Sequence, residues 1–187
     1  HFADGARPLA RDFTPVRWDA SKGTLVLEFA LHDAGPATEW AMSAALGQWV
    51  GIAGPRGSMV VPTGFDWHWL LGDETALPAI ARRLAELPAS AVATVRIQLN
   101  NPADQRVLAS AAQVDLQWVN ALPAAVEALA LPPGAGFVWA AGEHSDMAAV
   151  RRAVLAKPGV DPKRMRISAY WKRGAADHHE DLVSAAG

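Results

Sequence analysis

The stretch Trp67–Ala79, WHWLLGDETALPA, decides the fold of this chain because a run rich in apolar side chains leads through a glycine into a helix. The run Trp67–Leu71 predicts a buried strand that ends at Gly72. Thr75 is a suitable N-cap for the helix. Apolar residues then recur at helical spacing, at Leu77, Ile80, Leu84 and Leu87. Such a turn directs backbone N–H groups and the positive end of a helix dipole at one point, which favours phosphate and predicts a nucleotide site.

The turn departs from the ordinary dinucleotide fingerprint. Asp73 and Glu74 stand where the pattern G-x-G-x-x-G carries its further glycines. Pro78 fits the first turn of a helix, where a missing N–H costs little. An ordinary strand-to-helix turn without any ligand is therefore the alternative interpretation of the segment.

Composition limits the function. The chain has 187 residues, of which 51% are hydrophobic, and no apolar run is long enough to span a bilayer, so we expect a soluble, cytoplasmic protein without membrane insertion. A formal net charge of -2 lacks the basic excess of a nucleic-acid binder. The absence of cysteine excludes disulfides, thiolate catalysis, cysteine-ligated zinc and iron–sulfur clusters. Any redox chemistry therefore needs an organic cofactor, and the oligomeric state is left open.

The chain divides into two halves near residues 62–64. In the first half, Thr24–Leu31 and Gln48–Gly54 have strand patterns, and Pro36–Leu46 has a helical pattern that Gly47 ends. In the second half, strand patterns alternate with helical patterns, which is typical of a parallel sheet in an α/β fold. The predicted strands there are Trp67–Leu71, Val92–Leu99, Val114–Val119, Gly136–Ala141 and Arg166–Tyr170.

Two more features concern the second half. The best later helix starts with Ser145 as N-cap, and the segment Asn100–Gln113 is too polar for a helix. Ligands of α/β sheets bind outside the carboxyl ends of the strands, so Gly72 and Gly142 are expected to flank one crevice.

Basic residues gather between residues 151 and 173, where Asp161 is the only acid. Most of them are expected to be solvated surface charges. Lys172 and Arg173 follow Tyr170-Trp171 at the end of a predicted strand, so these two are expected to face an anion.

Six blocks of sequence, in this order, carry a family resemblance: ARDFTPVRWD (10–19), LEFALHDAGPATEWA (27–41), GIAGPRGS (51–58), LLGDETALPAIARRL (70–84), VWAAGE (138–143) and AYWKRGAADHHED (169–181). Together they resemble the siderophore-interacting protein family, the flavin- and NAD(P)H-dependent ferric-siderophore reductases of the ferredoxin-reductase-like group. The resemblance implies an FAD-binding antiparallel barrel over residues 1–63 and a Rossmann-like NAD(P)H domain over residues 64–187. Family members carry a longer segment before the R-x-Y-T motif than the ten residues that precede Arg11 here. The resemblance thus implies a barrel without its N-terminal strands, in a fragment or in a short relative.

The resemblance assigns two blocks to FAD. Arg11, Phe13 and Thr14 match the R-x-Y-T motif, in which the arginine meets the diphosphate, the ring packs on the flavin and the hydroxyl lies near its reactive nitrogen. Phe13 replaces the usual tyrosine and loses a hydroxyl hydrogen bond but keeps a stacking face. Asp33 stands where the family commonly has glycine. The second block contributes His32, Gly35, Ala37, Thr38 and Trp40.

The remaining blocks imply the dinucleotide and substrate sites. The resemblance places the nicotinamide dinucleotide on Gly72, Asp73, Glu74, Thr75, Ala76 and Leu77, with Gly142 and Glu143 facing it. Thr14, Trp171 and Lys172 are the implied catalytic residues, and Lys172 and Arg173 the implied siderophore contacts. Trp49, Trp67 and Trp139 are as well explained as core residues. His178-His179 lacks a supporting ligand set, so no metal site is expected.

The function implied is reduction of ferric siderophores by electrons from NAD(P)H through FAD. A general NAD(P)H:flavin reductase, or a nucleotide- or siderophore-binding module without turnover, are the alternatives. Gln98 at the end of the second sheet strand, with Arg96 and Arg106 nearby, favours NADPH over NADH.

Overall fold

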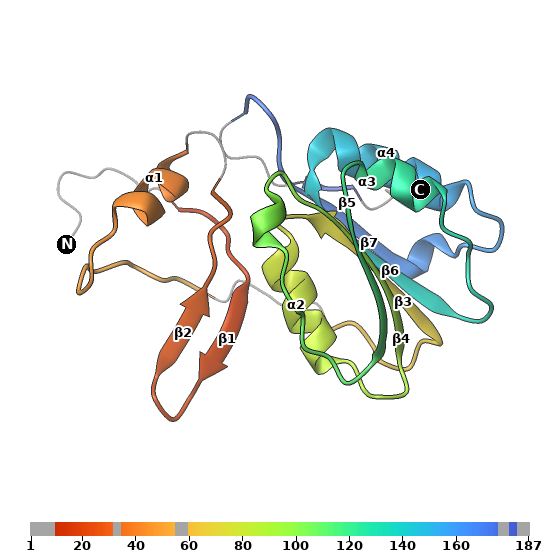
Figure 1. The fold of residues 1–187 in the computed structure, drawn as a ribbon, viewed down its shortest axis with the longest axis horizontal. Helices are drawn as coiled ribbons and strands as arrows, with labels where there is room; N and C mark the ends of the chain where they lie inside the picture. Colours follow the sequence, from red (N-terminus) through yellow and green to blue (C-terminus); the bar gives the residue numbers. More distant parts are fainter. Residues whose placement is uncertain (1–9, 32–34, 55–59, 176–179, 183–187) are drawn as a thin grey trace.

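The computed structural model describes residues 10–31, 35–54, 60–175 and 180–182. An antiparallel N-terminal part precedes a larger α/β part (Figure 1). In chain order the elements are β1 (Pro15–Asp19), β2 (Thr24–Leu27), α1 (Pro36–Ser43), β3 (Trp67–Asp73), α2 (Leu77–Glu86), β4 (Val92–Gln98), η2 (Pro102–Asp104), β5 (Gln113–Val119), α3 (Leu122–Glu127), β6 (Gly136–Glu143), α4 (His144–Leu155), η3 (Pro162–Arg164), β7 (Met165–Trp171) and β8 (Glu180–Asp181).

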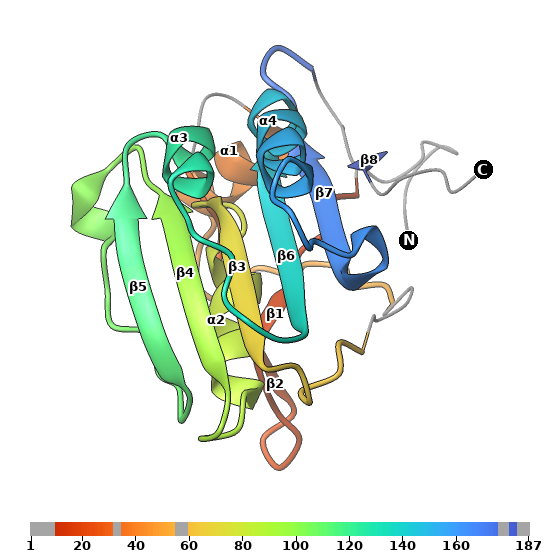
Figure 2. The same cartoon turned by 90° about the vertical axis from the view of Figure 1, so that its right-hand side faces the viewer.

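The α/β part is built on one sheet with the strand order β5-β4-β3-β6-β7-β8. The strands from β5 to β7 are parallel, and the short β8 pairs antiparallel with β7 (Figure 2). The first strand of this sheet, β3, lies in its middle. The chain then adds β4 and β5 on one side of β3 and returns to add β6 on the other side. This reversal is the topological switch point of a Rossmann-like sheet, and it lies between β3 and β6.

Helices cover the two faces of the sheet. On one face, Trp67, Trp69 and Leu71 of β3 pack with residues of α3 and α4 in one buried cluster. On the other face, Leu70 packs with Ile80 and neighbouring residues of α2. Strands buried on both faces are typical of parallel sheets, which explains why β3 is apolar along nearly its whole length.

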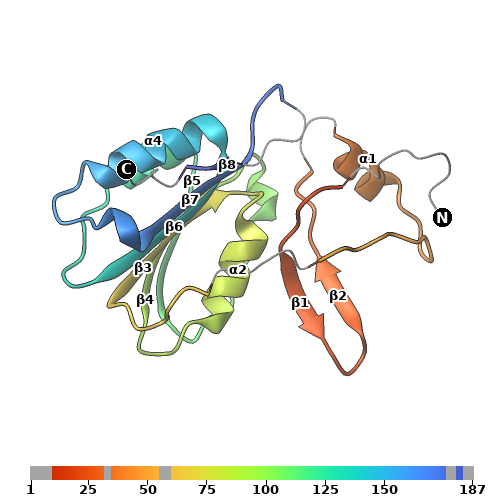
Figure 3. The same cartoon turned by 180° about the vertical axis from the view of Figure 1, so that it is seen from behind.

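The N-terminal part consists of the antiparallel pair β1–β2 and the helix α1 (Figure 3). Side chains of the α/β part hold it in place: Arg82 donates to the Pro15 carbonyl, and Arg106 is ion-paired with Glu28. Apolar side chains of this part remain exposed, including Trp18, Leu46, Trp49 and Ile52.

The expected fold class is confirmed, but several element boundaries differ. Gln48–Gly54 is not a strand, because its apolar side chains have no partner strand in the described chain and stay exposed. The strand predicted over Thr24–Leu31 ends at Leu27, and the helix predicted to Leu46 ends at Ser43. The segment between β4 and β5 holds only the 3₁₀ turn η2, as its polar composition predicted.

The two predicted N-caps are wrong. Helix α2 begins at Leu77 with Ala76 as its N-cap, since the Thr75 hydroxyl is bonded to Asp73 instead. Helix α4 begins at His144 and is capped by the Glu143 side chain rather than by Ser145. Among the described helices, none has the length and apolar character that crossing a bilayer requires.

Candidate active site at the carboxyl ends of the strands

Three neighbouring strands end together at the switch point. β3 ends at Asp73, β6 at Glu143 and β7 at Trp171. β6 lies between the other two, and Gly72 pairs with Ala141, so Gly72 and Gly142 lie near each other at the ends of adjacent strands. The crevice that they are expected to flank stays a prediction. The carboxylates of Asp73 and Glu143 are both almost fully buried, with 5% and 6% exposure. Buried carboxylates need strong hydrogen-bond donors, and both have them.

The Asp73 carboxylate accepts four hydrogen bonds. Its Oδ1 accepts from the Thr75 backbone N–H at 2.9 Å and from the Thr75 hydroxyl at 2.5 Å. Its Oδ2 accepts from the Glu143 backbone N–H at 2.9 Å and from the Trp171 indole Nε1–H at 2.8 Å. One side chain therefore joins the ends of β3, β6 and β7.

The Glu143 carboxylate caps helix α4. It accepts from the backbone N–H groups of Ser145 and Asp146, from the Ser145 hydroxyl, and at Oε1 from the Arg173 backbone N–H. Burial by itself would raise the pKa of Glu143, but these hydrogen bonds together hold the pKa below its usual value. Glu143 is therefore an ionised, fixed acceptor at neutral pH.

Asp146 lies beside this pair on the first turn of α4. Burial raises the pKa of Asp146, and the nearby negative charges of Glu143 and Asp73 raise it further. A hydrogen bond with the Gln98 side chain and the charge of Arg173 act in the opposite direction. The carboxyl ends of the strands thus carry clustered acidic groups close to Lys172 and Arg173.

Three N–H groups of the turn after Gly72, where phosphate is expected, already have acceptors within the turn. The N–H of Thr75 is bonded to Asp73 Oδ1, that of Ala76 to the Asp73 carbonyl, and that of Leu77 to the Glu74 carbonyl. Pro78 has no N–H. The absence of a side chain at Gly72 serves packing, because a Cβ there would lie 2.5 Å from the Ala76 Cβ. These three N–H groups are therefore taken up by acceptors within the turn, and the binding of phosphate at this turn stays a prediction.

The two predicted siderophore contacts are exposed at the end of β7. Lys172 forms an isolated antiparallel bridge with Ala175, which closes a tight turn after the strand. Arg173 is tied to Glu143 through its backbone, so its position relative to β6 is fixed. Both side chains are exposed, as an anion-facing role requires.

The residues assigned to FAD lie in the N-terminal part. The rings of Phe13 and Phe29 are 4.4 Å apart and those of Phe29 and Trp40 are 5.6 Å apart, so three aromatic side chains form one cluster. Phe13 keeps 38% of its surface exposed. The guanidinium of Arg11 is bonded to the Ala10 carbonyl in an exposed position.

The other residues assigned to FAD surround helix α1. Gly35 is the N-cap of α1, with no side chain bonded to the helix end, and Ala37 lies in the first turn. Thr38 is buried and Thr14 is partly buried. His32 lies outside the described residues.

The three residues expected to favour NADPH, Arg96, Gln98 and Arg106, differ in how available they are to a phosphate. Arg96 is buried and ion-paired with Asp115 on β5 at 2.7 Å, so it is not available to a phosphate. Gln98 accepts from the Leu122 N–H and thereby joins β4 to α3. Arg106 is partly exposed and lines an open groove of about 510 Å³ beside β5, together with Leu116 and Trp118.

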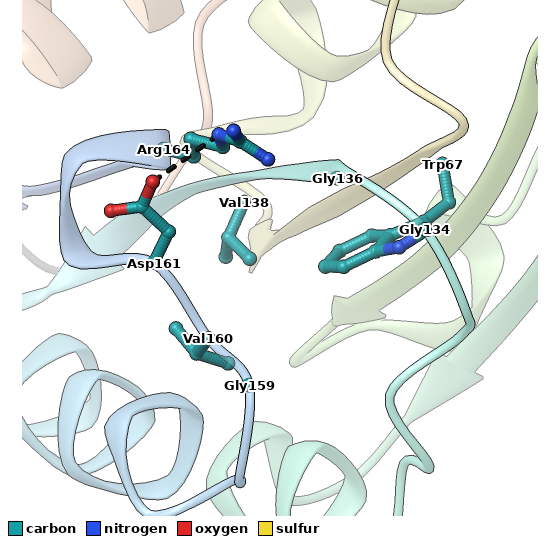
Figure 4. A pocket seen from close by; sticks show the side chains of 8 residues that line it. All are labelled: Trp67, Gly134, Gly136, Val138, Gly159, Val160, Asp161 and Arg164. Carbon is teal, nitrogen blue, oxygen red and sulfur yellow. Dashed lines mark ion pairs between the residues drawn. The ribbon is translucent and has the colours of Figure 1, made fainter.

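The remaining candidates are a small cavity, two tryptophan residues and a histidine pair. A cavity of about 30 Å³ lies at the opposite, amino ends of the strands, lined by Trp67, Gly136 and the ion pair Asp161–Arg164 (Figure 4). This volume holds about one water molecule and no nucleotide. Trp67 is a core residue, whereas Trp49 is 94% exposed and is not. His178-His179 lies outside the described residues, and no metal-binding cluster occurs within the described ones.

Comparison with known sequences matches two models to this chain. The model of the siderophore-interacting protein family covers residues 65–174. The model of the siderophore-interacting FAD-binding domain covers residues 1–59. The chain belongs to the siderophore-interacting protein family.

Two relatives are named for an enzymatic activity. The NADPH-dependent ferric-chelate reductase of Escherichia coli is 34% identical over 175 residues, which is 90% of this chain and 68% of that protein. The ferric vibriobactin reductase of Vibrio cholerae is 28% identical over 188 residues, which is 94% of this chain and 69% of that protein.

Solved structures of the family share the fold. A siderophore utilization protein from T. fusca superposes with a TM-score of 0.80 at 35% identity, over 89% of this chain and 67% of that one. The siderophore-interacting protein SipS from Aeromonas hydrophila gives a TM-score of 0.82 at 30% identity, over 91% of this chain and 71% of that one.

Sequence reasoning missed three parts of this site. It gave Asp73 a cofactor role and did not foresee its bonds to β6 and β7, because those bonds depend on strand order. It did not assign the N-cap to Glu143, which it placed on a loop. It also omitted Phe29 from the aromatic cluster, although Phe29 lies in the block LEFALHDAGPATEWA.

Proposed function

We propose that this chain reduces ferric siderophores, with electrons passing from NAD(P)H through FAD to Fe(III). The observation that carries the proposal is the joint presence of both family matches on one chain whose 34%-identical relative is an NADPH-dependent ferric-chelate reductase. When bound, NAD(P)H would supply a hydride and FAD would allow its two electrons to be passed on singly. Siderophores hold iron through hard oxygen donors suited to Fe(III), so reduction to Fe(II) weakens the complex. A nicotinamide reductant also fits a cytoplasmic location.

The residues of the N-terminal part fit a flavin. A partly exposed Phe13 ring, which contacts Phe29 in a cluster that Trp40 completes, provides an aromatic face. Arg11 provides a partly buried cation in the same block for the diphosphate, and the Thr14 hydroxyl follows Phe13. We assign FAD binding to domain 1–63 and dinucleotide binding to domain 64–187. The gap between the two family matches, from residue 59 to residue 65, supports this boundary.

The dinucleotide is assigned to the carboxyl edge of the sheet, where the turn Gly72–Leu77 meets Gly142 and Glu143. The paired N–H groups and the carboxylates of this turn do not fit a diphosphate bound directly to it. The exposed cations at the same edge, Lys172 and Arg173, offer the positive charge that phosphates need, whereas Arg106 is already ion-paired with Glu28. We therefore expect the turn to form one wall of the dinucleotide site without neutralising the charge of the phosphates.

Lys172 is assigned to the siderophore. It is exposed, it follows Trp171 at the end of β7, and the Lys172–Ala175 bridge restricts its backbone. A ferric catecholate siderophore carries negative charge, so a fixed cation at this edge would attract and orient it.

The test uses the FAD-supplemented protein with NADPH and a ferric catecholate siderophore, without oxygen, and traps Fe(II) with a coloured chelator. Lys172→Glu should weaken siderophore binding by about 1–3 kcal/mol, while the rate of flavin reduction by NADPH changes little. Lys163→Glu is the matched control, because Lys163 is an exposed lysine at the opposite end of β7. The control should behave like the parent protein.

Other outcomes identify the alternatives. Flavin reduction without any dependence of Fe(II) release on siderophore would indicate a general NAD(P)H:flavin reductase. Binding of NADPH or siderophore without flavin reduction would indicate a binding module. Loss of flavin reduction in Lys172→Glu with normal siderophore binding would make Lys172 a dinucleotide ligand.

A further inference from the structure

The hydrogen bond between Asp73 and Trp171 spans a strand. Asp73 ends β3, Trp171 ends β7, and β6 lies between them in the sheet. The Trp171 Nε1 to Asp73 Oδ2 distance is nevertheless 2.8 Å. Because the two strands are not neighbours, this bond requires free space over β6 for the Asp73 carboxylate. It also requires an indole that is turned toward β3.

Gly142 of β6 leaves this space free, because it has no side chain. It has a φ of 155°, and a Cβ built on it would lie 2.7 Å from Asp73 Oδ2 and 2.9 Å from Asp73 Cγ. The Asp73 carboxylate therefore occupies the space that a side chain at position 142 would fill. Any larger residue there would displace the carboxylate from the position that reaches Trp171.

A bulge in the β6–β7 pairing turns the indole. Gly142 pairs with Ala169, but Glu143 pairs with Trp171, so Tyr170 is passed over. Bulges of this kind re-aim side chains and are common next to active sites. Trp171 thereby leaves the regular alternation of β7 and points its N–H toward Asp73.

The local turn alone does not explain these bonds. A carboxylate that only stabilised the turn would bond to Thr75, and Asp73 Oδ1 does this. Its second oxygen is directed away from the turn, to the Glu143 N–H and the Trp171 indole. Hydrogen bonds to a buried carboxylate are about twice as strong as neutral ones, so the indole is held firmly.

We propose that Asp73 is a positioning residue whose carboxylate, passing over Gly142, fixes the orientation of the Trp171 indole at the carboxyl edge of the sheet. The inference rests on the proposed function only in that Trp171 is assigned to the site where the nicotinamide is oxidised. Preorganising an aromatic side chain by a buried hydrogen bond reduces the freedom that a bound ring would otherwise have to remove.

The first test needs no cofactor. In a ¹⁵N-labelled protein the indole N–H signals are separate from the backbone signals, and the signal missing in Trp171→Phe belongs to Trp171. In Asp73→Ala this N–H should exchange with solvent about tenfold faster or more, because its charged acceptor is gone. Thr75→Val is the matched control, since it removes another donor to the same carboxylate and should leave the Trp171 signal protected.

The other indole signals, which should stay in place, report whether Asp73→Ala remains folded. If Asp73→Ala does not fold, Asp73→Asn and Gly142→Ala replace it, since the first lacks one acceptor oxygen and the second displaces the carboxylate. Unchanged protection of the Trp171 N–H in a folded variant would overturn the inference.

The second test is a double-mutant cycle on NADPH binding. If Asp73 acts through Trp171, Asp73→Asn combined with Trp171→Phe should bind NADPH no more weakly than Trp171→Phe alone. Additive losses would instead show that Asp73 contacts the dinucleotide itself and would overturn the positioning role. The indole exchange measurement needs no reductase assay. It therefore tests the positioning role of Asp73 even if the proposed reductase function is wrong.

Discussion

A side chain at position 72 would meet two neighbours at once. Its Cβ would lie 2.5 Å from the Ala76 Cβ and 2.7 Å from the Ala141 carbonyl oxygen, and both are fully buried residues. Gly72 therefore lets α2 approach β3 closely at the switch point. Close helix–strand packing is one of the roles that glycines play in Rossmann-type turns, and it needs no ligand.

This role predicts the effect of Gly72→Ala on stability. Because the neighbours are buried backbone and a helix N-cap, the added methyl group is expected to lower the free energy of unfolding by about 2–3 kcal/mol. Combining it with Ala76→Gly should recover part of the loss, since one of the two close contacts disappears. Urea unfolding of the two variants measures both values. Equal stability of Gly72→Ala and the parent would show that the packing is looser than the structure indicates.

At the scale of elements, helix α4 depends on a cap that comes from the preceding strand. Glu143 is the last residue of β6, and its carboxylate accepts from two backbone N–H groups of the first turn of α4. The same side chain accepts from the Arg173 N–H after β7. One carboxylate thus stabilises the start of a helix and the end of a neighbouring strand.

Glu143→Gln should therefore lower the free energy of unfolding by about 1–2 kcal/mol at pH 7, as expected for a lost N-cap. The pKa of Glu143 is lowered in the folded protein, so its stabilising effect is present above the unfolded pKa and is lost as the pH falls through the folded pKa. The difference between the variant and the parent should shrink over that range of pH.

Urea unfolding at a series of pH values measures this dependence. Glu86→Gln is the control, because Glu86 is half exposed and its ion pair with Arg82 is an i,i+4 pair at the helix surface. A difference for Glu143→Gln that stayed constant down to pH 3 would contradict the role of its charge.

The elements also show what the sequence could predict. Strands β3 and β6 were recognisable because burial on both faces makes them apolar, and this pattern is local. Helix α3 was not predicted, since Leu122–Glu127 is too short to show a helical period. The strand predicted over Gln48–Gly54 had the right composition, but a strand needs a partner, and a sequence pattern does not reveal one. The hydrogen bonds of Asp73 were unpredictable for the same reason.

At the scale of the whole molecule, the two parts differ in how they are held together. The α/β part has buried clusters on both faces of its sheet. The N-terminal part has a two-stranded sheet and several exposed large apolar side chains, and its bonds to α2 and Arg106 lie at the surface. A two-stranded sheet is only marginally stable by itself, and exposed ion pairs contribute about 1 kcal/mol or less.

This contrast predicts unequal amide hydrogen exchange. Amides of β3, β4 and β6 should exchange only on global unfolding, whereas those of β1 and β2 should exchange by local opening, about a hundredfold faster or more. Glu28→Gln, which weakens the ion pair with Arg106, should speed exchange in β1 and β2 and leave β3 unchanged. Mass spectrometry of peptides from the two parts measures both rates. Equal protection of β1 and β3 would mean that the parts unfold as one unit, and the surface contacts with α2 would then have to be far stronger than their exposure suggests.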